Sequence, residues 1–376
     1  MVLHIPAQDL TIAFACNLQN IDREPYVKQL YQAVTDRSWD IPVYTRDKFD
    51  AALYRGMSET FNYGAVAFER STRSVPSDPS AAAKAFAYFN KFVNLDQLRA
   101  DFDATVAAIN DGRHPVSGTP LVKVGSQMAQ VLLKKYGRER RDSYNSGGAI
   151  SFFADYIAMY KKEARYPAEL RFNESFEKLV EKWNSDWTRT WNNYTQRFDF
   201  TAGSDLKNID QTLRPLFAGA EVYPNLINQL LDIRLQFEKK KDWGLAADAS
   251  RLAAELYPQS DRATAFYAIS LALIGKKDEA RTTLRRAVGI NPRGIGSPVA
   301  LNQIALAIAN TDKFSAAIDW LEISTEIYPG DANLITTLGE FYQKGGRTEQ
   351  AVEAYKRALA IDPNFEKAKS ALKSLP

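Results

Sequence analysis

The sequence predicts a mainly α-helical protein in three parts: a short N-terminal β-hairpin remnant with a helix, an irregular helical middle domain, and a C-terminal superhelix of four repeats. Three observations predict this fold class. Two short apolar runs flank a polar turn at the N-terminus, helical periodicity dominates the middle of the chain, and a 34-residue pattern recurs toward the C-terminus. The three parts are expected at residues 1–36, 40–225 and 227–376.

The first element is a hairpin. Residues 3–5 and 10–15 read as two apolar strands joined by the polar turn Pro6-Ala7-Gln8-Asp9. A hairpin alone is marginally stable in water, and no third strand-like stretch of similar quality follows it in the sequence. The next element is an amphipathic helix, with Pro25 in its first turn and an apolar face made of Tyr26, Leu30, Ala33 and Val34.

The middle region is expected to be helical because its apolar and aromatic residues recur at helical spacing. Four helices are predicted there: one after 77–80, one containing Val122 to Leu132 and ending near Gly137, one from Ile150 to about Lys162, and one containing Phe176 to Trp191. The residues from Asp205 to Leu226 read as connecting structure that leads into the repeats.

Two features of the middle region have a structural and a functional interpretation. Trp183, Trp187 and Trp191 form one stripe along a helix, which we interpret as packing; a stacking platform for sugars or bases is the alternative. The basic run at 134–141 reads as a helix C-terminus followed by a solvated turn, and an anion-binding site is the alternative.

The last third of the chain repeats itself. Four units are expected at 227–260, 261–294, 298–331 and 332–365, followed by a capping helix. A proline closes each unit, and the longer step between the second and third is explained by three extra residues after Arg293. The same residue types recur at matching positions of the four units: the prolines are Pro258, Pro292, Pro329 and Pro363, and the alanines are Ala246, Ala280, Ala317 and Ala351.

This pattern resembles the tetratricopeptide (TPR) repeat, a pair of antiparallel helices. In the last unit Leu338-Gly339, Tyr342, Ala351, Tyr355, Ala358 and Pro363 stand at consensus positions 7–8, 11, 20, 24, 27 and 32. Small residues at positions 8, 20 and 27 let the two helices approach, larger apolar residues fill the space between them, and proline ends the second helix. The first unit departs most from the pattern, with Arg234 at position 8 and Ser250 at position 24.

Composition excludes several functional classes. Forty-eight basic and 45 acidic residues leave a net charge of +3, which gives no reason to expect binding to nucleic acid or to an anionic membrane. Cys16 is the only cysteine and His4 and His114 are the only histidines, so we expect no disulfide framework, no metal site and no cofactor.

The sequence carries no recognisable membrane or export signal. The longest clean apolar run, from Leu10 to Cys16, is too short to span a bilayer, and the N-terminus lacks the basic region of a signal peptide. We therefore expect a cytoplasmic protein as written, or a periplasmic or secreted one if a longer parent gene carries a signal.

The N-terminus resembles the end of a serine β-lactamase-like (penicillin-binding-protein-like) hydrolase domain. The order strand, turn, strand, CNLQN, helix is similar to that family's last two strands and terminal helix. DIPVYTRDKFDAALYRGM and GRHPVSGTPLVKVGSQMAQVLL look similar to the region downstream in larger bacterial members, some of which end in TPR repeats. The resemblance implies the C-terminal part of a serine hydrolase that lacks its catalytic domain.

Catalysis in that family requires three motifs that precede the terminal hairpin. These are Ser-x-x-Lys, then Tyr-x-Asn or Ser-x-Asn, then Lys-Thr-Gly or His-x-Gly. Ser175-Phe176-Glu177-Lys178 and Tyr88-Phe89-Asn90 match two of them, but in reversed order, and the third motif is absent from the sequence. We therefore expect no catalytic residues in this chain; a hydrolase whose catalytic motifs lie upstream is the alternative.

The favoured function is a non-catalytic interaction scaffold. TPR arrays bind peptides or helices along the concave face formed by the first helix of each repeat. The expected groove residues occupy positions 5 and 9 of those helices: Leu231, Leu235, Ala265, Ile269, Asn302, Leu306, Thr336 and Glu340. A protein or peptide partner, or intramolecular docking on the middle domain, would fill this groove, and a small-ligand module in the middle region is a third possibility.

Overall fold

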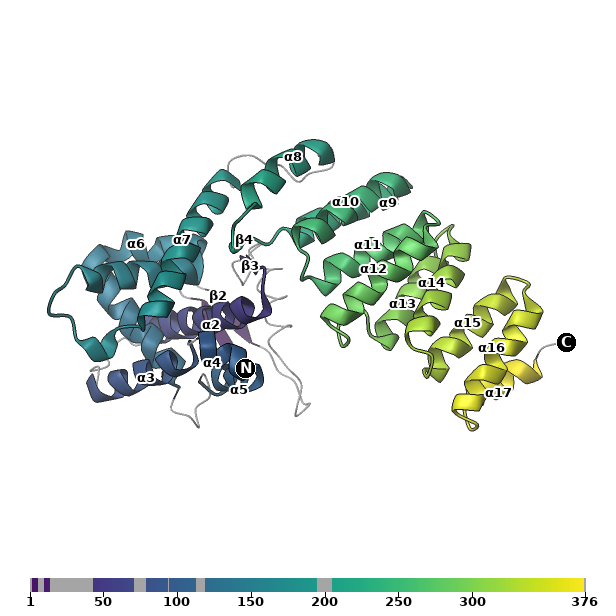
Figure 1. Cartoon of the computed structure of the whole chain (residues 1–376), viewed down its shortest axis with the longest axis horizontal. Helices are drawn as coiled ribbons and strands as arrows, with labels where there is room; N and C mark the ends of the chain where they lie inside the picture. Colours follow the sequence, from purple (N-terminus) through teal and green to yellow (C-terminus); the bar gives the residue numbers. More distant parts are fainter. Residues whose placement is uncertain are drawn as a thin grey trace. The chain divides into compact units, whose positions relative to one another are not determined.

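The computed structural model describes residues 2–5, 10–13, 43–70, 79–93, 95–112, 119–194 and 205–374. The chain forms two compact units. Unit 1 comprises Met1–Arg189 and Glu221–Pro224, and unit 2 comprises Thr190–Ala220 and Asn225–Pro376. Helices make up most of both units, which confirms the predicted fold class (Figure 1).

The N-terminal hairpin is present. Strands β1 (Val2–Ile5) and β2 (Leu10–Ala13) pair antiparallel, with Val2 opposite Ala13 and Ile5 opposite Leu10. These two strands form a sheet by themselves within the described part of the chain. The amphipathic helix expected to follow, as well as Cys16 and His114, lies outside the described residues.

A second small sheet was not predicted. Strand β3 (Val43–Thr45) pairs antiparallel with β4 (Val222–Pro224), so two short strands follow the hairpin that the sequence pattern did not indicate. The buried rings of Tyr44 and Tyr223 lie 5.1 Å apart across this sheet. Three-residue strands so far apart in the sequence leave no periodicity to detect, and β4 falls in the stretch read as connecting structure.

Unit 1 is built mainly from helices. They are α2 (Lys48–Arg70), α3 (Pro79–Phe92), α4 (Leu95–Ala100), α5 (Phe102–Gly112), α6 (Pro120–Lys161), the 3₁₀ turn η3 (Ala168–Leu170) and α7 (Glu174–Tyr194). Gly137 and Gly148 have φ values of 78° and 70° and interrupt α6. These breaks lie at the predicted helix end near Gly137 and just before the predicted helix start at Ile150.

Aromatic side chains form the core of unit 1. Phe89 of α3 contacts four other rings, with centroid separations of 5.1–5.6 Å, namely those of Phe92, Phe153, Phe172 and Phe176. The buried phenol of Tyr156 lies 2.7 Å from that of Tyr166 and donates to the carbonyl of Leu170 at 2.9 Å. The aromatic residues predicted to pack therefore do so, and the polar end of Tyr156 is satisfied inside the core.

The tryptophan stripe of α7 is also a packing feature. Trp183 and Trp187 are fully buried, and the indole N–H of Trp183 donates to Glu221 at 3.2 Å. Neither ring has a free face for a sugar or a base, so the structure contradicts a stacking platform at these two residues.

Helices α2 and α6 cross at two glycines. A Cβ atom added to Gly64 would overlap Gly125, and one added to Gly125 would lie 2.8 Å from Gly64 Cα and would overlap the carbonyl of Thr60. Ser126 donates from its hydroxyl to the carbonyl of Gly64 at 3.0 Å. Backbone therefore packs directly on backbone at this crossing, which only residues without a side chain permit.

We predict that Gly125→Ala destabilises unit 1 by about 1–3 kcal/mol, because the added methyl group must push two helices apart. Urea denaturation followed by circular dichroism measures this. Gly289→Ala in a helix of unit 2 is the matched control, since its added Cβ meets nothing within 4 Å. Equal stability of the two variants would contradict the close packing.

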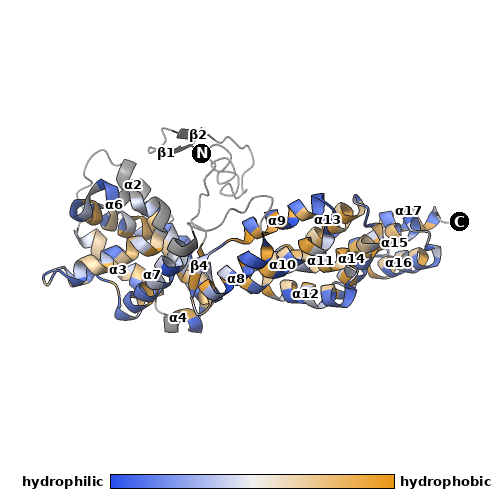
Figure 2. Cartoon of the chain, turned by 90° about the horizontal axis from the view of Figure 1, so that it is seen from above, coloured by the Kyte–Doolittle hydropathy of each residue, from blue (hydrophilic) through white to orange (hydrophobic). Residues whose placement is uncertain are grey.

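Unit 2 is a row of antiparallel helix pairs that follows helix α8 (Leu206–Phe217) (Figure 1). The pairs are α9 (Ile227–Lys239) with α10 (Trp243–Leu256), α11 (Asp261–Leu273) with α12 (Lys277–Ile290), α13 (Pro298–Ala309) with α14 (Phe314–Ile327), and α15 (Ala332–Lys344) with α16 (Thr348–Ile361). Helix α17 (Glu366–Lys373) follows the last pair. In Figure 2, α9 and α13 lie along one edge of the row and α12 and α16 along the opposite edge.

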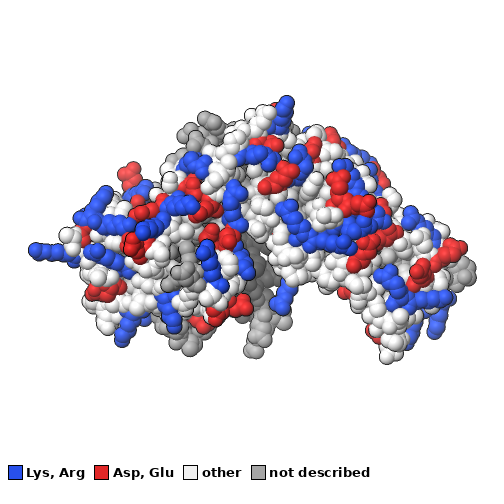
Figure 3. Space-filling view, viewed as in Figure 1, with Lys and Arg blue, Asp and Glu red and all other residues white. Residues whose placement is uncertain are grey.

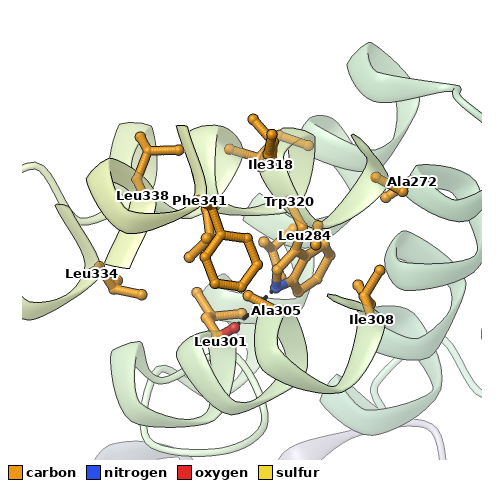
Figure 4. Close-up of a cluster of buried hydrophobic side chains, with 14 of the residues drawn as sticks. Ala272, Leu284, Leu301, Ala305, Ile308, Ile318, Trp320, Leu334, Leu338 and Phe341 are labelled. Atoms are coloured by element: carbon orange, nitrogen blue, oxygen red, sulfur yellow. Dashed lines mark hydrogen bonds between the residues drawn. The ribbon is translucent and has the colours of Figure 1, made fainter. Parts of the chain in front are cut away.

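The helix pairs share a continuous core. Figure 4 shows its centre, where Trp320 of α14 packs among Leu284, Ala305 and Phe341 and donates its indole N–H to the carbonyl of Leu301 at 3.1 Å. The alanines at position 20 are all buried. At position 8, a Cβ on Gly339 would lie 2.6 Å from the ring of Tyr355 at position 24, so a small residue there makes room for the tyrosine.

The longer connection between the second and third repeats coincides with an ionic seam. Basic residues of α12 face acidic residues of α14: Lys277 binds Asp319 at 3.0 Å and also Glu322, and Arg281 binds Glu326 at 2.6 Å. Lys277, Asp319 and Glu322 are half-buried, whereas Glu326 is exposed, and Glu322 also accepts from the Tyr342 hydroxyl at 2.6 Å. Both signs of charge alternate over this side of the protein in Figure 3, as expected where charges pair.

The two departures of the first repeat from the TPR pattern both contact Ser270 of the second repeat. Arg234 at position 8 is buried and donates to Ser270 at 3.2 Å, and Ser250 at position 24 lies 2.9 Å from the same Ser270 hydroxyl. The Arg234 guanidinium also lies 4.6 Å from the centroid of the Phe266 ring, so the arginine packs against α11 of the second repeat. Glu238 neutralises the guanidinium at 2.6 Å, and burial lowers the pKa of Arg234 and raises that of Glu238.

We predict that Arg234→Ala lowers the free energy of unfolding by about 3 kcal/mol, because it leaves Glu238 as an unpaired buried charge. The double variant Arg234→Gly with Ser250→Tyr places the glycine–tyrosine pair of the fourth repeat in the first, and Glu238→Gln in the same chain removes the carboxylate left without its partner. Together these changes should recover at least about half of that loss. A double-mutant cycle by chemical denaturation measures the coupling. Strictly additive effects of the two substitutions would contradict an interaction between the two positions.

Candidate functional site

The residues that match hydrolase motifs have structural roles. The Ser175 hydroxyl donates to Asn173 Oδ1 at 2.7 Å at the start of α7, and Lys178 pairs with Glu174 at 2.6 Å. Asn90 donates to the carbonyl of Arg171 at 2.9 Å, and the Tyr88 hydroxyl donates to that of Ala108 at 2.7 Å. Each group holds a helix end or a loop in place, so these motifs do not assemble a nucleophile and base.

The basic run at 134–141 is partly neutralised. Lys135 pairs with Glu163 at 3.0 Å, and Arg140 binds both carboxylate oxygens of Asp155, at 2.6 and 3.0 Å. The Tyr144 hydroxyl donates to the same carboxylate at 2.6 Å, and burial raises the pKa of this phenol. Two cations of the run therefore already have carboxylate partners, which argues against an anion site. The expected turn is limited to the break at Gly137, since the rest of the run lies within α6.

One carboxyl group of unit 1 has an unusual environment. Asp50, in the first turn of α2, is half-buried close to Asp47 and Glu221. Burial, with the repulsion of these two carboxylates, raises its pKa to about 6, and the nearby cations Arg99 and Lys182 only partly oppose this. Raised carboxyl pKa values occur at catalytic sites, but no group of three or more His, Cys, Asp or Glu in the described ranges could hold a metal ion.

Asp50 is expected to make stability depend on pH. Its folded pKa of about 6 exceeds the unfolded value of 3.8, so its contribution is favourable at low pH and is lost as pH rises through 6. Asp50→Asn should therefore raise the melting temperature of unit 1 at pH 8 by at least about 2 °C and have a smaller effect at pH 5. Thermal scans at both pH values test this, with the exposed Glu169→Gln as control; equal gains at both would contradict it.

A cavity of about 400 Å³ lies between α8, α9 and α10. Its apolar lining is Leu206, Phe237, Leu245 and Leu252, and its charged lining is Asp205, Lys207, Asp210, Asp248 and Arg251. Most of these charges already have partners: Asp205 caps α8, Asp210 binds Arg214 at 2.8 Å, and Arg251 binds Asp248 at 3.4 Å. The cavity therefore offers mainly apolar surface.

The predicted groove residues fall into two groups. Leu231, Ala265, Ile269 and Thr336 are buried, and the Thr336 hydroxyl donates to its own helix at 2.7 Å. Leu235 and Leu306, both at position 9, are 44% and 45% exposed. Asn302 and Glu340 are half-buried, and Glu340 pairs with Lys367 of α17 at 3.2 Å.

Helix α11 is recessed between α9 and α13. The turns after α9 and α13 meet, with Lys241 Nζ 2.9 Å from Asp312 Oδ2, and α11 lies between these helices in the sequence of repeats. Along α11, Ile269 and Leu273 are buried, whereas Leu235 on α9 and Leu306 on α13 are exposed at the same register position. The floor of this face is therefore apolar, and each flanking helix presents a leucine.

The exposed side of α13 was missed by the sequence prediction. Val299 at position 2 is 67% exposed, and Gln303, Leu306 and Asn310 continue the same stripe along the helix. Helix α13 contains no charged residue, unlike the first helices of the other repeats. That absence of charge was visible in the sequence, but exposure at position 2 depends on how the repeats stack.

The geometry of unit 2 defines a helical-repeat solenoid. The tetratricopeptide repeat family matches residues 332–365, the range expected for the fourth unit, so the chain contains a TPR domain. Small glutamine-rich tetratricopeptide repeat-containing protein 2 of Mycosarcoma maydis is 31% identical over 87 residues, 23% of this chain and 24% of that protein. The peroxisomal targeting signal receptor of Candida glabrata is 29% identical over 105 residues, 27% of this chain and 18% of that protein.

The chain thus spans about a quarter or less of the length of these curated relatives. Similar solved structures include MamA of Desulfovibrio magneticus RS-1, with 19% identity, a TM-score of 0.23, and coverage of 39% of this chain and 81% of that one. YrrB, described as a TPR protein with an unusual peptide-binding site, has 20% identity, a TM-score of 0.24, and coverage of 45% and 84%. Among the described residues, no helix is both long and apolar enough to cross a bilayer.

Proposed function

We propose that this protein is a non-catalytic interaction scaffold whose TPR domain binds a protein or peptide on the face formed by α9, α11, α13 and α15. The observation that carries this proposal is the pair of exposed leucines, Leu235 and Leu306, on either side of the buried Ile269. Exposed apolar side chains at a shared register position form a surface that loses water favourably when a partner covers it. One of the curated relatives is by name a receptor for a targeting signal, a role of the same class.

The proposed division of labour follows the three parts expected from sequence. Residues 227–376 bind the partner, and the described helices α2 to α7 within 40–225 form a helical domain with an aromatic core. Intramolecular docking of the middle domain on the TPR face is the competing way to cover the leucines. If the middle domain docks in this way, the TPR face of the full chain should not bind peptides.

The finer hypothesis is that the N-terminal hairpin belongs to a β-lactamase-like serine hydrolase whose catalytic motifs lie upstream. The antiparallel register of β1 and β2 fits the resemblance, but Ser175 and Lys178 are engaged in helix capping and an ion pair. We expect no labelling of this chain by a fluorescent fluorophosphonate or penicillin. Stoichiometric labelling that Ser175→Ala abolishes would overturn the non-catalytic assignment.

Selection from a random 12-residue peptide library on the full chain tests the scaffold function. Peptides selected on the wild type should bind the double variant Leu235→Glu, Leu306→Glu at least about 10-fold more weakly, measured by fluorescence anisotropy. Ile361→Glu is the matched control, because Ile361 is similarly exposed, at 41%, on the second helix of a repeat. Failure to select peptides, or equal affinity of the double variant, would overturn the proposed function.

A further inference from the structure

One position in the turn between the two helices of each repeat is filled in two ways. Gly275 in the second repeat and Gly346 in the fourth stand at position 15, and both have a left-handed backbone, with φ values of 79° and 74°. The first and third repeats have Lys241 and Asp312 at the same position. Lys241 keeps the left-handed conformation, with a φ of 59°, which is unfavourable for a residue with a side chain. The conformation of this turn therefore favours glycine over lysine at residue 241.

The two residues that stand in place of glycine contact each other. Lys241 Nζ lies 2.9 Å from Asp312 Oδ2, although the residues belong to the first and third repeats. Beside this pair, the Lys313 ammonium lies 5.4 Å from the centroid of the Trp243 ring, in a cation–π contact that joins the same two repeats. Repeats of a solenoid normally contact only their immediate neighbours. Both contacts depart from this rule, because they skip the second repeat.

The long connection between the second and third repeats accounts for the meeting of these turns. Seven residues, 291–297, join α12 to α13, whereas 257–260 and 328–331 make the other two connections with four residues each. The long connection acts as a spacer, since Ile295 packs against the shared core. Because the helices of a pair are antiparallel, the turns within repeats line one edge of the row and the connections line the other. A spacer on the second edge tips the third repeat toward the first at the turns.

We propose that Lys241 and Asp312 form a latch between the first and third repeats, which holds the first three repeats at a fixed curvature and opens as ionic strength rises. The two side chains are 69% and 48% exposed, so the ion pair adds little to the stability of the fold and is screened by salt. Bending between repeats is easier than unfolding them, because each repeat packs mainly on its neighbours. A weak contact that spans three repeats therefore changes their curvature without changing the fold.

The latch also affects the proposed binding face. Leu235 and Leu306 stand at position 9 of α9 and α13, the two helices whose turns the latch joins. Opening the latch therefore moves the two leucines apart, and a partner that contacts both binds the closed form more tightly. This consequence rests on the proposed function, whereas the latch itself is testable without a partner.

Electron–electron distance measurements on the spin-labelled full chain test the latch. Cys16→Ser removes the only cysteine, and Lys239→Cys with Ala307→Cys places nitroxide labels at exposed positions of α9 and α13. We expect the mean label distance to be at least about 3 Å longer at about 1 M than at about 0.1 M sodium chloride, because the Debye length falls from about 10 Å to about 3 Å. An unchanged distance would overturn opening by salt.

Three variants of the labelled chain separate the latch from a local role of the turn. Lys241→Gly supplies the residue of the second and fourth repeats, so it should keep or raise the melting temperature. It should nevertheless give the long distance at both salt concentrations. Lys240→Gln removes a neighbouring exposed charge and should behave as the wild type. The charge-reversed pair Lys241→Asp with Asp312→Lys should restore the short distance at low salt.

The outcomes distinguish the latch from the proposed function. A short distance in Lys241→Gly at low salt would overturn the latch, and so would a charge-reversed pair that stays at the long distance. Equal lengthening in Lys240→Gln would also overturn it, because the effect would then come from net charge. Library peptides that depend on Leu235 and Leu306, yet bind Lys241→Gly as tightly as the wild type, would overturn only the effect of the latch on binding and would leave the proposed function standing.

Discussion

The close approach of two helices across a small residue is the constraint on which this structure depends. In the fourth repeat, Gly339 admits the ring of Tyr355, and in unit 1 Gly64 and Gly125 admit each other's backbone. Close-packed interiors penalise a single added methyl group at such points. In the first repeat the buried Arg234 and Ser250 take the corresponding positions, and both contact Ser270 of the second repeat instead.

This constraint explains which parts of the fold could be predicted. The four repeats were visible because each places its small residues and its proline at a fixed spacing within 34 residues, so local periodicity reports on tertiary packing. The crossing of α2 and α6, and the pairing of β3 with β4, join segments far apart in the chain. Neither contact produces a periodic pattern in the sequence, so the structure was needed to find both.

The candidate site was predicted in part for the same reason. Register placed Leu235 and Leu306 at the same position of their helices, and both side chains are exposed. The register did not show that Leu231 and Ala265 would be buried, because neighbouring helices cover them. It also did not predict the exposure of Val299. Exposure depends on how the repeats stack, which the sequence of one helix does not determine.

The division of the chain into two units has a consequence for its synthesis. The chain leaves unit 1 after Arg189, contributes α8 to unit 2, returns as β4 and then leaves again. Strand β3 therefore emerges from the ribosome long before its partner, and the sheet closes only after α8 has been made. An N-terminal segment that ends at Arg189 would therefore lack one strand of unit 1. No single cut in the chain separates the two units completely.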